Sequence, residues 1–240
     1  MSLLAIDVGA GTQDILLYSE DVSLEGSTKM VLPSQTVLVG NRINQARLAS
    51  RDVFLRGPTM GGGASTAAIR WHLAAGLQVY ATASAAATIN DNLERVAALG
   101  VSIQEEAPGQ AEVIETGDID VAALRRALQI FDIALPRDMA VAVQDHGYSP
   151  DRSNRLVRFE HLAAAIRSGG SLEAFAYKEP PKAMTRMLAV RDSLAKTGIE
   201  PLLMDTGPAA IFGAALDLPD DRPALIINFG NGHTVAALLA

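Results

Sequence analysis

Two glycine-rich segments combine residue types and spacing in a way that points most directly to chemistry. The first reads IDVGAG at residues 6–11 and the second reads INFGNG at residues 227–232, and each lies between two short apolar runs. Their alignment pairs Asp7 with Asn228, Gly9 with Gly230, and Gly11 with Gly232. An internal repeat of this kind predicts two matched β-hairpin turns with a shared role.

Turns of this composition can bind phosphate. Glycine adopts positive φ and lets the backbone approach a ligand closely, so that successive N–H groups form a concave anion site. Asp7 would repel a phosphate, but its carboxylate can hold a hydrated Mg²⁺ that bridges to the phosphates. The residues expected to contact a nucleotide are Gly9, Ala10, Gly11, Thr12, Gln13, Asn228, Gly230, Asn231, Gly232, His233 and Thr234. Either segment alone would be an ordinary hairpin turn, whereas the repeat favours phosphate binding.

Further polar residues follow other predicted strands. Asp145 is a candidate general base, with His146 as a proton shuttle and Gln144 as an alternative residue for positioning water; a plain polar turn is the other interpretation. Asp205 is a candidate ligand for Mg²⁺ through water, or an N-cap for the helix that follows. The run MGGGAST at residues 60–66 is either an anion site at a helix N-terminus, or a flexible connector or a place of tight helix–strand packing.

Apolar runs and helix signals predict an α/β protein, because strands alternate with helices. Strands are expected at residues 3–6, 15–18, 53–55, 77–81, 139–143, 201–204, 225–228 and 235–239, with one or two more within 30–39, broken by Pro33. Helices are expected at residues 65–75, 121–130, 161–166, 180–196 and 208–215, and one is expected after an N-cap at Asn90.

The two loops and the order of the elements around them resemble the superfamily of actin, the heat-shock seventy-kilodalton chaperones, and the acetate and sugar kinases. Residues 7–14 are similar to its first phosphate loop, residues 228–234 to its second, and residues 205–217 to the helix before the second. Within the superfamily, the chain looks most like a prokaryotic family labelled as pyruvate formate-lyase activating enzymes.

The resemblance implies a ribonuclease H-like, actin-type ATPase fold, in which each lobe has a mixed β-sheet flanked by helices. Residues 1–200 would form the first lobe, with a βαβ-type insertion at about 50–118. Residues 201–240 would begin a second lobe that continues beyond Ala240. ATP and Mg²⁺ would be the cofactors, with Asp7 and Asp205 as metal ligands and Asp145 and Asp7 as catalytic residues.

Two features depart from what the resemblance implies. Asn228 stands where active members of the superfamily usually have Asp, and an amide is a poorer ligand for Mg²⁺ than a carboxylate. This places phosphoryl transfer in doubt, but not nucleotide binding. In addition, a pyruvate formate-lyase activase needs three closely spaced cysteines for its iron–sulfur cluster, and the chain has no cysteine. We therefore do not take that family label as a description of chemistry.

Composition argues against several classes of protein. Without cysteine there are no disulfides, thiolate metal sites or thiol nucleophiles. The formal net charge is −7 and Lys and Arg do not cluster, which argues against a nucleic-acid or anionic-membrane partner. No apolar run approaches the roughly 20 residues of a membrane-spanning helix, and no secretory leader is present, so we expect a cytoplasmic protein. The composition is compatible with a homodimer.

Together these features predict an ATP-binding protein that uses Mg²⁺ for phosphoryl transfer to an unknown small molecule or for ATP hydrolysis. The alternative is a nucleotide-responsive binding or regulatory protein without turnover, which Asn228 favours. A third alternative is an actin-like assembly protein, for which the sequence offers no specific support.

Overall fold

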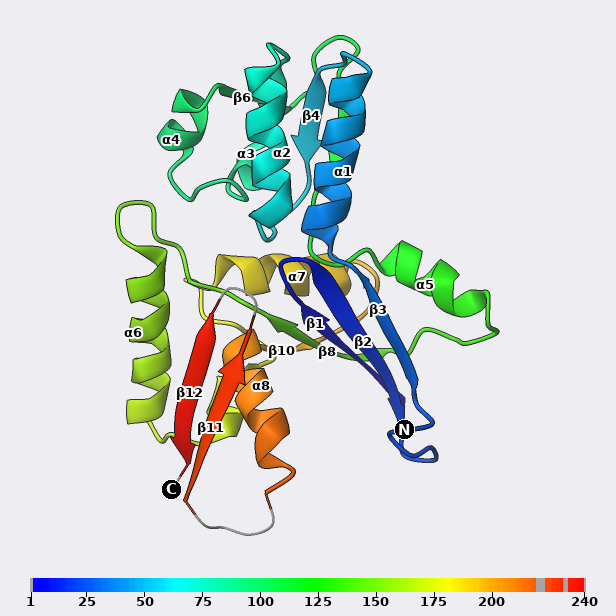
Figure 1. Cartoon of the computed structure of the whole chain (residues 1–240), viewed down its shortest axis with the longest axis vertical. Helices are drawn as coiled ribbons and strands as arrows, with labels where there is room; N and C mark the ends of the chain where they lie inside the picture. Colours follow the sequence, from blue (N-terminus) through cyan, green and yellow to red (C-terminus); the bar gives the residue numbers. More distant parts are fainter. Residues whose placement is uncertain (1, 219–222, 231–232, 240) are drawn as a thin grey trace.

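The structure is a computed structural model that describes residues 2–218, 223–230 and 233–239. Figure 1 shows a six-stranded sheet with its helices in the lower part of the molecule and a four-stranded sheet with its helices in the upper part. A two-stranded hairpin near the end of the chain lies beside the lower unit. The prediction of a mixed α/β protein with helices flanking its sheets is confirmed.

The six-stranded sheet has the order β3-β2-β1-β8-β10-β9. Its first half is an antiparallel meander, and the later strands β8 and β10 run parallel to β1. The carboxyl ends of β1, β8 and β10 therefore lie along one edge of the sheet. The strands are β1 (Ser2–Val8), β2 (Thr12–Ser19), β3 (Thr28–Pro33), β8 (Asp138–Val143), β9 (Ala176–Tyr177) and β10 (Leu202–Met204).

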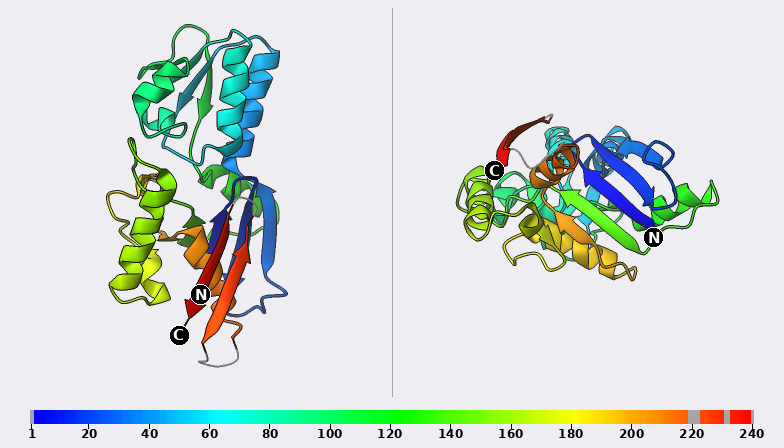
Figure 2. Two further views of the ribbon diagram at one scale, coloured as in Figure 1. Left: turned by 60° about the vertical axis from the view of Figure 1, so that its left-hand side comes forward. Right: turned by 90° about the horizontal axis from the view of Figure 1, so that it is seen from below.

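Alternation along β1 places Leu4, Ile6 and Val8 on one face of this sheet, and Asp7 on the other face with Leu3 and Ala5. Leu4, Ile6 and Val8 are buried in a core with residues of α5 (Val121–Gln129) and α7 (Thr185–Ala195). The other face is occupied by α8 (Thr206–Ala215), and the view from below in Figure 2 shows α7 and α8 on opposite sides of the strands. Asp7 therefore points out of the core towards the α8 side.

The upper unit contains a parallel sheet with the strand order β6-β5-β4-β7. Its strands lie within the insertion predicted at 50–118, and helix α1, which precedes that range, contributes Val39, Ile43 and Ala46 to the same core. The elements are α1 (Gln35–Leu48), β4 (Val53–Arg56), α2 (Gly63–Ala74), β5 (Val79–Ala81), α3 (Ala83–Ala86), α4 (Leu93–Ala98), β6 (Val101–Ile103) and β7 (Glu112–Glu115).

The hairpin predicted near the end of the chain is present as β11 (Ala224–Phe229) and β12 (Thr234–Leu239). Helix α8 packs against it, and the chain between β8 and α8 also forms α6 (Asn154–Arg167) and the short η1 (Leu172–Phe175). Strand β10 belongs to the first sheet, whereas β11 and β12 form a sheet of their own. A second lobe that begins near residue 201 stays a prediction.

The predicted strand content of residues 30–39 is wrong beyond Pro33. Strand β3 ends at Pro33, Ser34 is the N-cap, and helix α1 begins at Gln35. Val39, Ile43 and Ala46 are spaced as one helical face, which the strand interpretation overlooked. Helix α4 likewise takes its N-cap from Asn92 rather than from Asn90, since Asn92 accepts hydrogen bonds from the first N–H groups of the helix.

Candidate functional site

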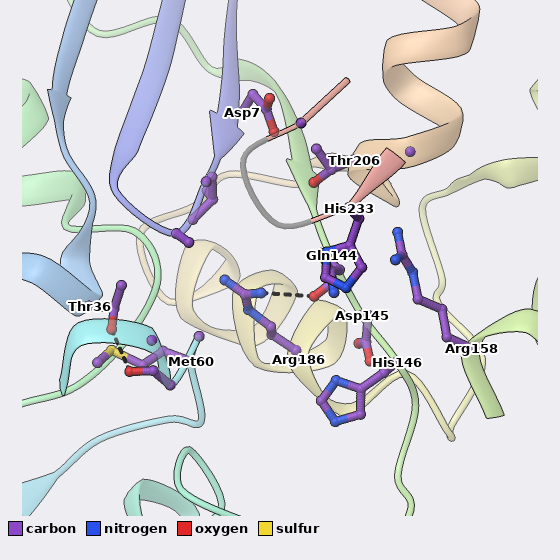
Figure 3. A pocket seen from close by; sticks show the side chains of 18 of the residues that line it. Asp7, Thr36, Met60, Gln144, Asp145, His146, Arg158, Arg186, Thr206 and His233 are labelled. Carbon is purple, nitrogen blue, oxygen red and sulfur yellow. Dashed lines mark hydrogen bonds between the residues drawn. The ribbon is translucent and has the colours of Figure 1, made fainter. Parts of the chain in front are cut away.

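A cavity of about 520 Å³ lies where the carboxyl edge of the first sheet faces the upper unit. Both glycine-rich turns contribute to its wall: the first through Gly9, Ala10 and Thr12, and the second through Asn228, Gly230 and His233. Figure 3 shows Asp7 and Thr206 at one end of this cavity and His146 at the other, with Arg186 between them. The two turns, which are more than 200 residues apart in the sequence, therefore share one cavity.

The two turns are closed by the same kind of backbone hydrogen bond. The Gly9 N–H donates to the Thr12 carbonyl at 2.8 Å, and the Gly230 N–H donates to the His233 carbonyl at 2.9 Å. A Cβ atom at Gly9 would lie 2.9 Å from the Thr12 oxygen, and one at Gly230 would lie 3.0 Å from the His233 oxygen. Glycine is therefore required at Gly9, and at Gly230 a side chain would fit only if the His233 carbonyl moved slightly.

Positive φ is not the reason for glycine in the first turn, so that part of the sequence argument is wrong. Neither Gly9 nor Gly11 has positive φ. A Cβ atom at Gly11 would meet nothing within 4 Å. The fold itself therefore does not require glycine at residue 11, although a side chain there would reduce the space beside the turn.

Two carboxylates face each other across the first hairpin. Asp7 of β1 is the direct partner of Asp14 of β2, and both line the cavity. Like charges in directly opposed positions repel each other, so this pair destabilises the hairpin when no cation lies between the carboxylates. The Thr12 hydroxyl donates to Asp14 at 3.3 Å, which offsets only part of that repulsion. The pair is therefore a natural place for a cation.

Asp7 shows the electrostatic consequence of this arrangement. The pKa of its carboxyl is raised, first because burial disfavours the charged form and second because Asp14 is close; the nearby Thr206 side chain opposes the rise. Its Oδ1 atom is buried and has no well-aligned hydrogen-bond partner among the described residues. The Oγ1 atom of Thr206 is in the same situation. Two buried polar atoms beside the cavity, which lie close to each other, thus lack a hydrogen bond of good geometry.

Four helices begin at the cavity wall. Thr36 lies in the first turn of α1, Gly63 in that of α2, Thr185 in that of α7 and Thr206 in that of α8, and all four residues line the cavity. Each helix N-terminus carries a partial positive charge that favours anions, and at α7 and α8 the carboxylates of Asp145 and Asp205 already accept hydrogen bonds from some of the N–H groups. The cavity therefore combines carboxylates that suit a cation with helix termini that suit an anion.

Asp145, which lines the cavity, and Asp205, which lies behind it, both have structural roles. The Asp145 carboxylate accepts hydrogen bonds from the N–H groups of Gly147 and Met187, both at 2.8 Å, and the second bond caps α7. Asp205 is the N-cap of α8 through Gly207 at 2.9 Å, and it also accepts a hydrogen bond from the Asp145 N–H. The sequence indicated two possible roles for Asp205, a ligand for Mg²⁺ and an N-cap. The structure contains the N-cap.

Two arginines that the sequence analysis missed are held by buried ion pairs. Arg158 of α6 pairs with Asp205, and Arg186 of α7 donates to both oxygens of Asp118 at 2.7 and 2.8 Å. Arg186 also donates to the Gln144 carbonyl at 2.8 Å. A Cβ atom at Gly61 would lie 2.7 Å from the Arg186 guanidinium. Gly61 therefore lies against Arg186, and the role of the glycine-rich run at residues 60–66 stays a prediction.

A histidine and an aspartate from different parts of the fold meet at the other end of the cavity. His146 follows β8, and its Nε2 atom lies 3.6 Å from the Asp91 carboxylate, which comes from the segment between α3 and α4. Asp91 also accepts the Ser149 N–H at 2.8 Å. Burial raises the pKa of Asp91, but the contacts with His146 and the Ser149 amide outweigh it, so the pKa is lowered.

The remaining predicted residues lie in several places. Gln13 is buried and donates to the Pro33 carbonyl at 3.1 Å, outside the cavity wall. Gly11, Thr234 and Asp205 also lie outside the wall. Asn231 and Gly232 lie outside the described residues. In the described part of the chain, no three His, Asp or Glu side chains gather closely enough to hold a metal ion on their own.

Comparison with known proteins gives one match. Residues 60–240 match the family described as "Putative pyruvate format-lyase activating enzyme (DUF1786)", which is more than half of the chain. The chain belongs to this family. The matched range contains the second glycine-rich turn, whereas the first lies before it. Neither the curated proteins nor the solved structures gave a match. None of the helices in the described ranges is long and apolar enough to cross a membrane.

Proposed function

We propose that this protein binds ATP with Mg²⁺ in the cavity and transfers the terminal phosphoryl group to water or to a small molecule. One observation carries the proposal: two turns closed by matching backbone hydrogen bonds contribute to the wall of one cavity, beside the Asp7–Asp14 pair. A polyphosphate with a bound cation matches both halves of this chemistry, because its anionic oxygens suit the helix N-termini and its cation suits the carboxylates.

The sheet topology supports the actin and sugar-kinase resemblance. An antiparallel meander of β1, β2 and β3 that continues into the parallel strands β8 and β10 is the arrangement that a ribonuclease H-like core would have. The activity in the family description is not what we propose. An activase of that kind needs cysteines for an iron–sulfur cluster, and these 240 residues contain none.

The residues fit the roles that the proposal gives them. Asp7, whose Oδ1 atom lacks a partner, would hold the metal with Asp14, and the Thr206 hydroxyl would contact the phosphates or a metal-bound water. Ala10, Gly230 and the first turn of α8 would surround the phosphate chain. Bound Mg²⁺ would neutralise charge on the phosphates, which is its usual contribution to phosphoryl transfer.

Asn228 gives a specific reason to keep a second candidate, a nucleotide-responsive binding protein without turnover. Asn228 lines the cavity, and its partner across the second hairpin is Val235. The second turn therefore lacks the carboxylate pair of the first, and any metal would depend on Asp7 and Asp14. A site with one carboxylate pair can still bind Mg·ATP, and turnover decides between the two candidates.

Calorimetric titration of ATP into the protein, with and without Mg²⁺, tests the proposal. We expect binding that needs Mg²⁺ and that Asp7→Asn weakens at least about tenfold, equivalent to about 1.4 kcal/mol. Asp138→Asn is the matched control, because Asp138 begins β8 at the far end of the sheet and is exposed. No binding to the wild type, or an equal effect of both substitutions, would refute the proposal. Phosphate release then separates an ATPase from a binding protein.

A further inference from the structure

The contact between His146 and Asp91 joins the two units of the molecule at the cavity. His146 belongs to the loop after β8 of the six-stranded sheet, and Asp91 belongs to the α3–α4 connection of the upper unit. The His146 side chain is 36 % exposed, whereas the Asp91 side chain is only 10 % exposed. The histidine is therefore accessible from the cavity, with a more deeply buried carboxylate beside it.

The backbone on both sides of His146 is firmly held. The Asp145 N–H donates to Asp205, and the Asp145 carboxylate binds the Gly147 N–H at 2.8 Å. The N–H of Tyr148 then donates to the Ala183 carbonyl at 2.6 Å. Gly147 has φ +75°, and a Cβ atom there would lie 2.9 Å from the His161 ring. Because these hydrogen bonds hold the backbone on both sides of His146, its side chain is preorganised in the way that catalysis requires.

We infer that His146 is the general base of the proposed phosphoryl transfer, that Asp91 is its positioning residue, and that the acceptor is therefore a hydroxyl group. This inference rests on the proposed function. As the acceptor oxygen forms a bond to the γ-phosphorus, the bond from phosphorus to the β–γ bridging oxygen breaks and its electron pair leaves with ADP. The acceptor proton moves to Nδ1, the ring nitrogen that does not face Asp91. Asp91 then stabilises the imidazolium cation that forms.

His146 suits this role better than Asp145. Both oxygens of Asp145 already accept backbone hydrogen bonds, and its carboxylate caps α7, so the structure accounts for Asp145 without catalysis. The separation of 3.6 Å between His146 and Asp91 allows an ion pair that strengthens when the proton arrives.

The acceptor class follows from the need for a base. A carboxylate acceptor carries no proton at neutral pH and gains nothing from a base, whereas water or an alcohol must lose one. The space between Asp7 and His146 in Figure 3 is where the phosphate chain and such an acceptor would meet.

The test uses the full chain with Mg·ATP and three acceptors: water alone, glycerol as an alcohol, and acetate as a carboxylate. Product formation is followed as phosphate release, glycerol phosphate, or an acyl phosphate trapped by hydroxylamine. We expect turnover with water or glycerol, and a loss of about 10²- to 10⁴-fold in kcat for His146→Ala with an unchanged KM for ATP. Free imidazole should restore part of the His146→Ala rate, because it can occupy the vacated space and accept the proton.

Asp91→Asn should lower kcat by less than His146→Ala does, without rescue by imidazole, because the base itself remains. Glu94→Gln and Tyr148→Phe are matched controls near the two residues, since both side chains are exposed and lie outside the cavity wall. Circular dichroism and calorimetric binding of Mg·ATP establish that each variant is folded.

Each other outcome has a definite meaning. Transfer to acetate that His146→Ala leaves unchanged would overturn the inference, as would hydrolysis at an unchanged rate in that variant. Mg·ATP binding without turnover on any acceptor would also overturn it, while the proposed nucleotide binding would stand as the second candidate. An absence of Mg·ATP binding to the wild type would overturn both.

Discussion

Substituting Asp7 by Asn should stabilise the ligand-free protein while it weakens the binding of Mg·ATP. The expectation comes from the position of Asp7, which is directly opposite Asp14 on the neighbouring strand and has a raised pKa. Asn has nearly the same shape as Asp but carries no charge, so the substitution removes the repulsion without leaving a cavity. If Asp7 served only to stabilise the fold, replacing it would not be expected to raise the stability of the protein.

The size of the gain follows from the cross-strand pair. Like charges in directly opposed positions cost about 0.2–1 kcal/mol, and the partial burial of Asp7 acts in the same direction. For a chain of this length, that range corresponds to a rise in Tm of roughly 0.4–4 °C. The sign of the pH dependence follows as well: the folded pKa of Asp7 lies above the unfolded value of about 3.9, so the ionised carboxylate lowers stability as pH rises.

Urea unfolding of the wild type and Asp7→Asn at pH 7 and pH 5, without nucleotide, measures this effect. The variant should be the more stable of the two at pH 7, and the difference should shrink as the pH is lowered, because the raised pKa of Asp7 lets the folded protein take up this proton before the unfolded chain does. Addition of Mg·ATP should reverse the order, because only the wild type gains from binding. A variant that is less stable without ligand yet binds Mg·ATP normally would refute the reasoning and make Asp7 a structural residue.

Substitutions at four other residues test the geometry. Gly9→Ala should cost about 1–3 kcal/mol in urea unfolding because its Cβ meets the turn carbonyl, whereas Gly11→Ala should leave stability unchanged. Arg186→Ala should cost about 3–5 kcal/mol, because it leaves Asp118 buried without its partner; Arg186→Lys retains part of that energy. His72 is fully buried and its pKa is lowered, first by that burial, so stability should fall as pH drops below about 6.5; His72→Gln should remove that part of the pH dependence.

Local patterns in the sequence predicted the parts of the site that depend on neighbouring residues. The two glycine turns, the strands on either side of them, and the position of Asp7 at a strand end all follow from short segments. Asp205 also falls in this class, because a polar residue between a strand and a helix is a common N-cap. The position of Asp14 opposite Asp7 could also have been predicted, since the tight turn at residues 9–12 fixes this pairing.

The rest of the cavity depends on tertiary contacts that no local pattern carries. Arg186 is in the wall because Asp118, 68 residues away, anchors its guanidinium there. Asp91 reaches His146 only because the upper unit folds against the edge of the first sheet. Helix α1 was missed for a different reason: its buried residues include Gln35 and Thr36, so polar side chains obscure its apolar face.

A crystal structure of the full chain with Mg²⁺ and a non-hydrolysable ATP analogue tests the central claim most directly. We predict a triphosphate that contacts both the turn at Gly9 and the turn at Gly230, with its metal at the Asp7 carboxylate. A nucleotide bound elsewhere, or one that touches only one of the two turns, would contradict the account.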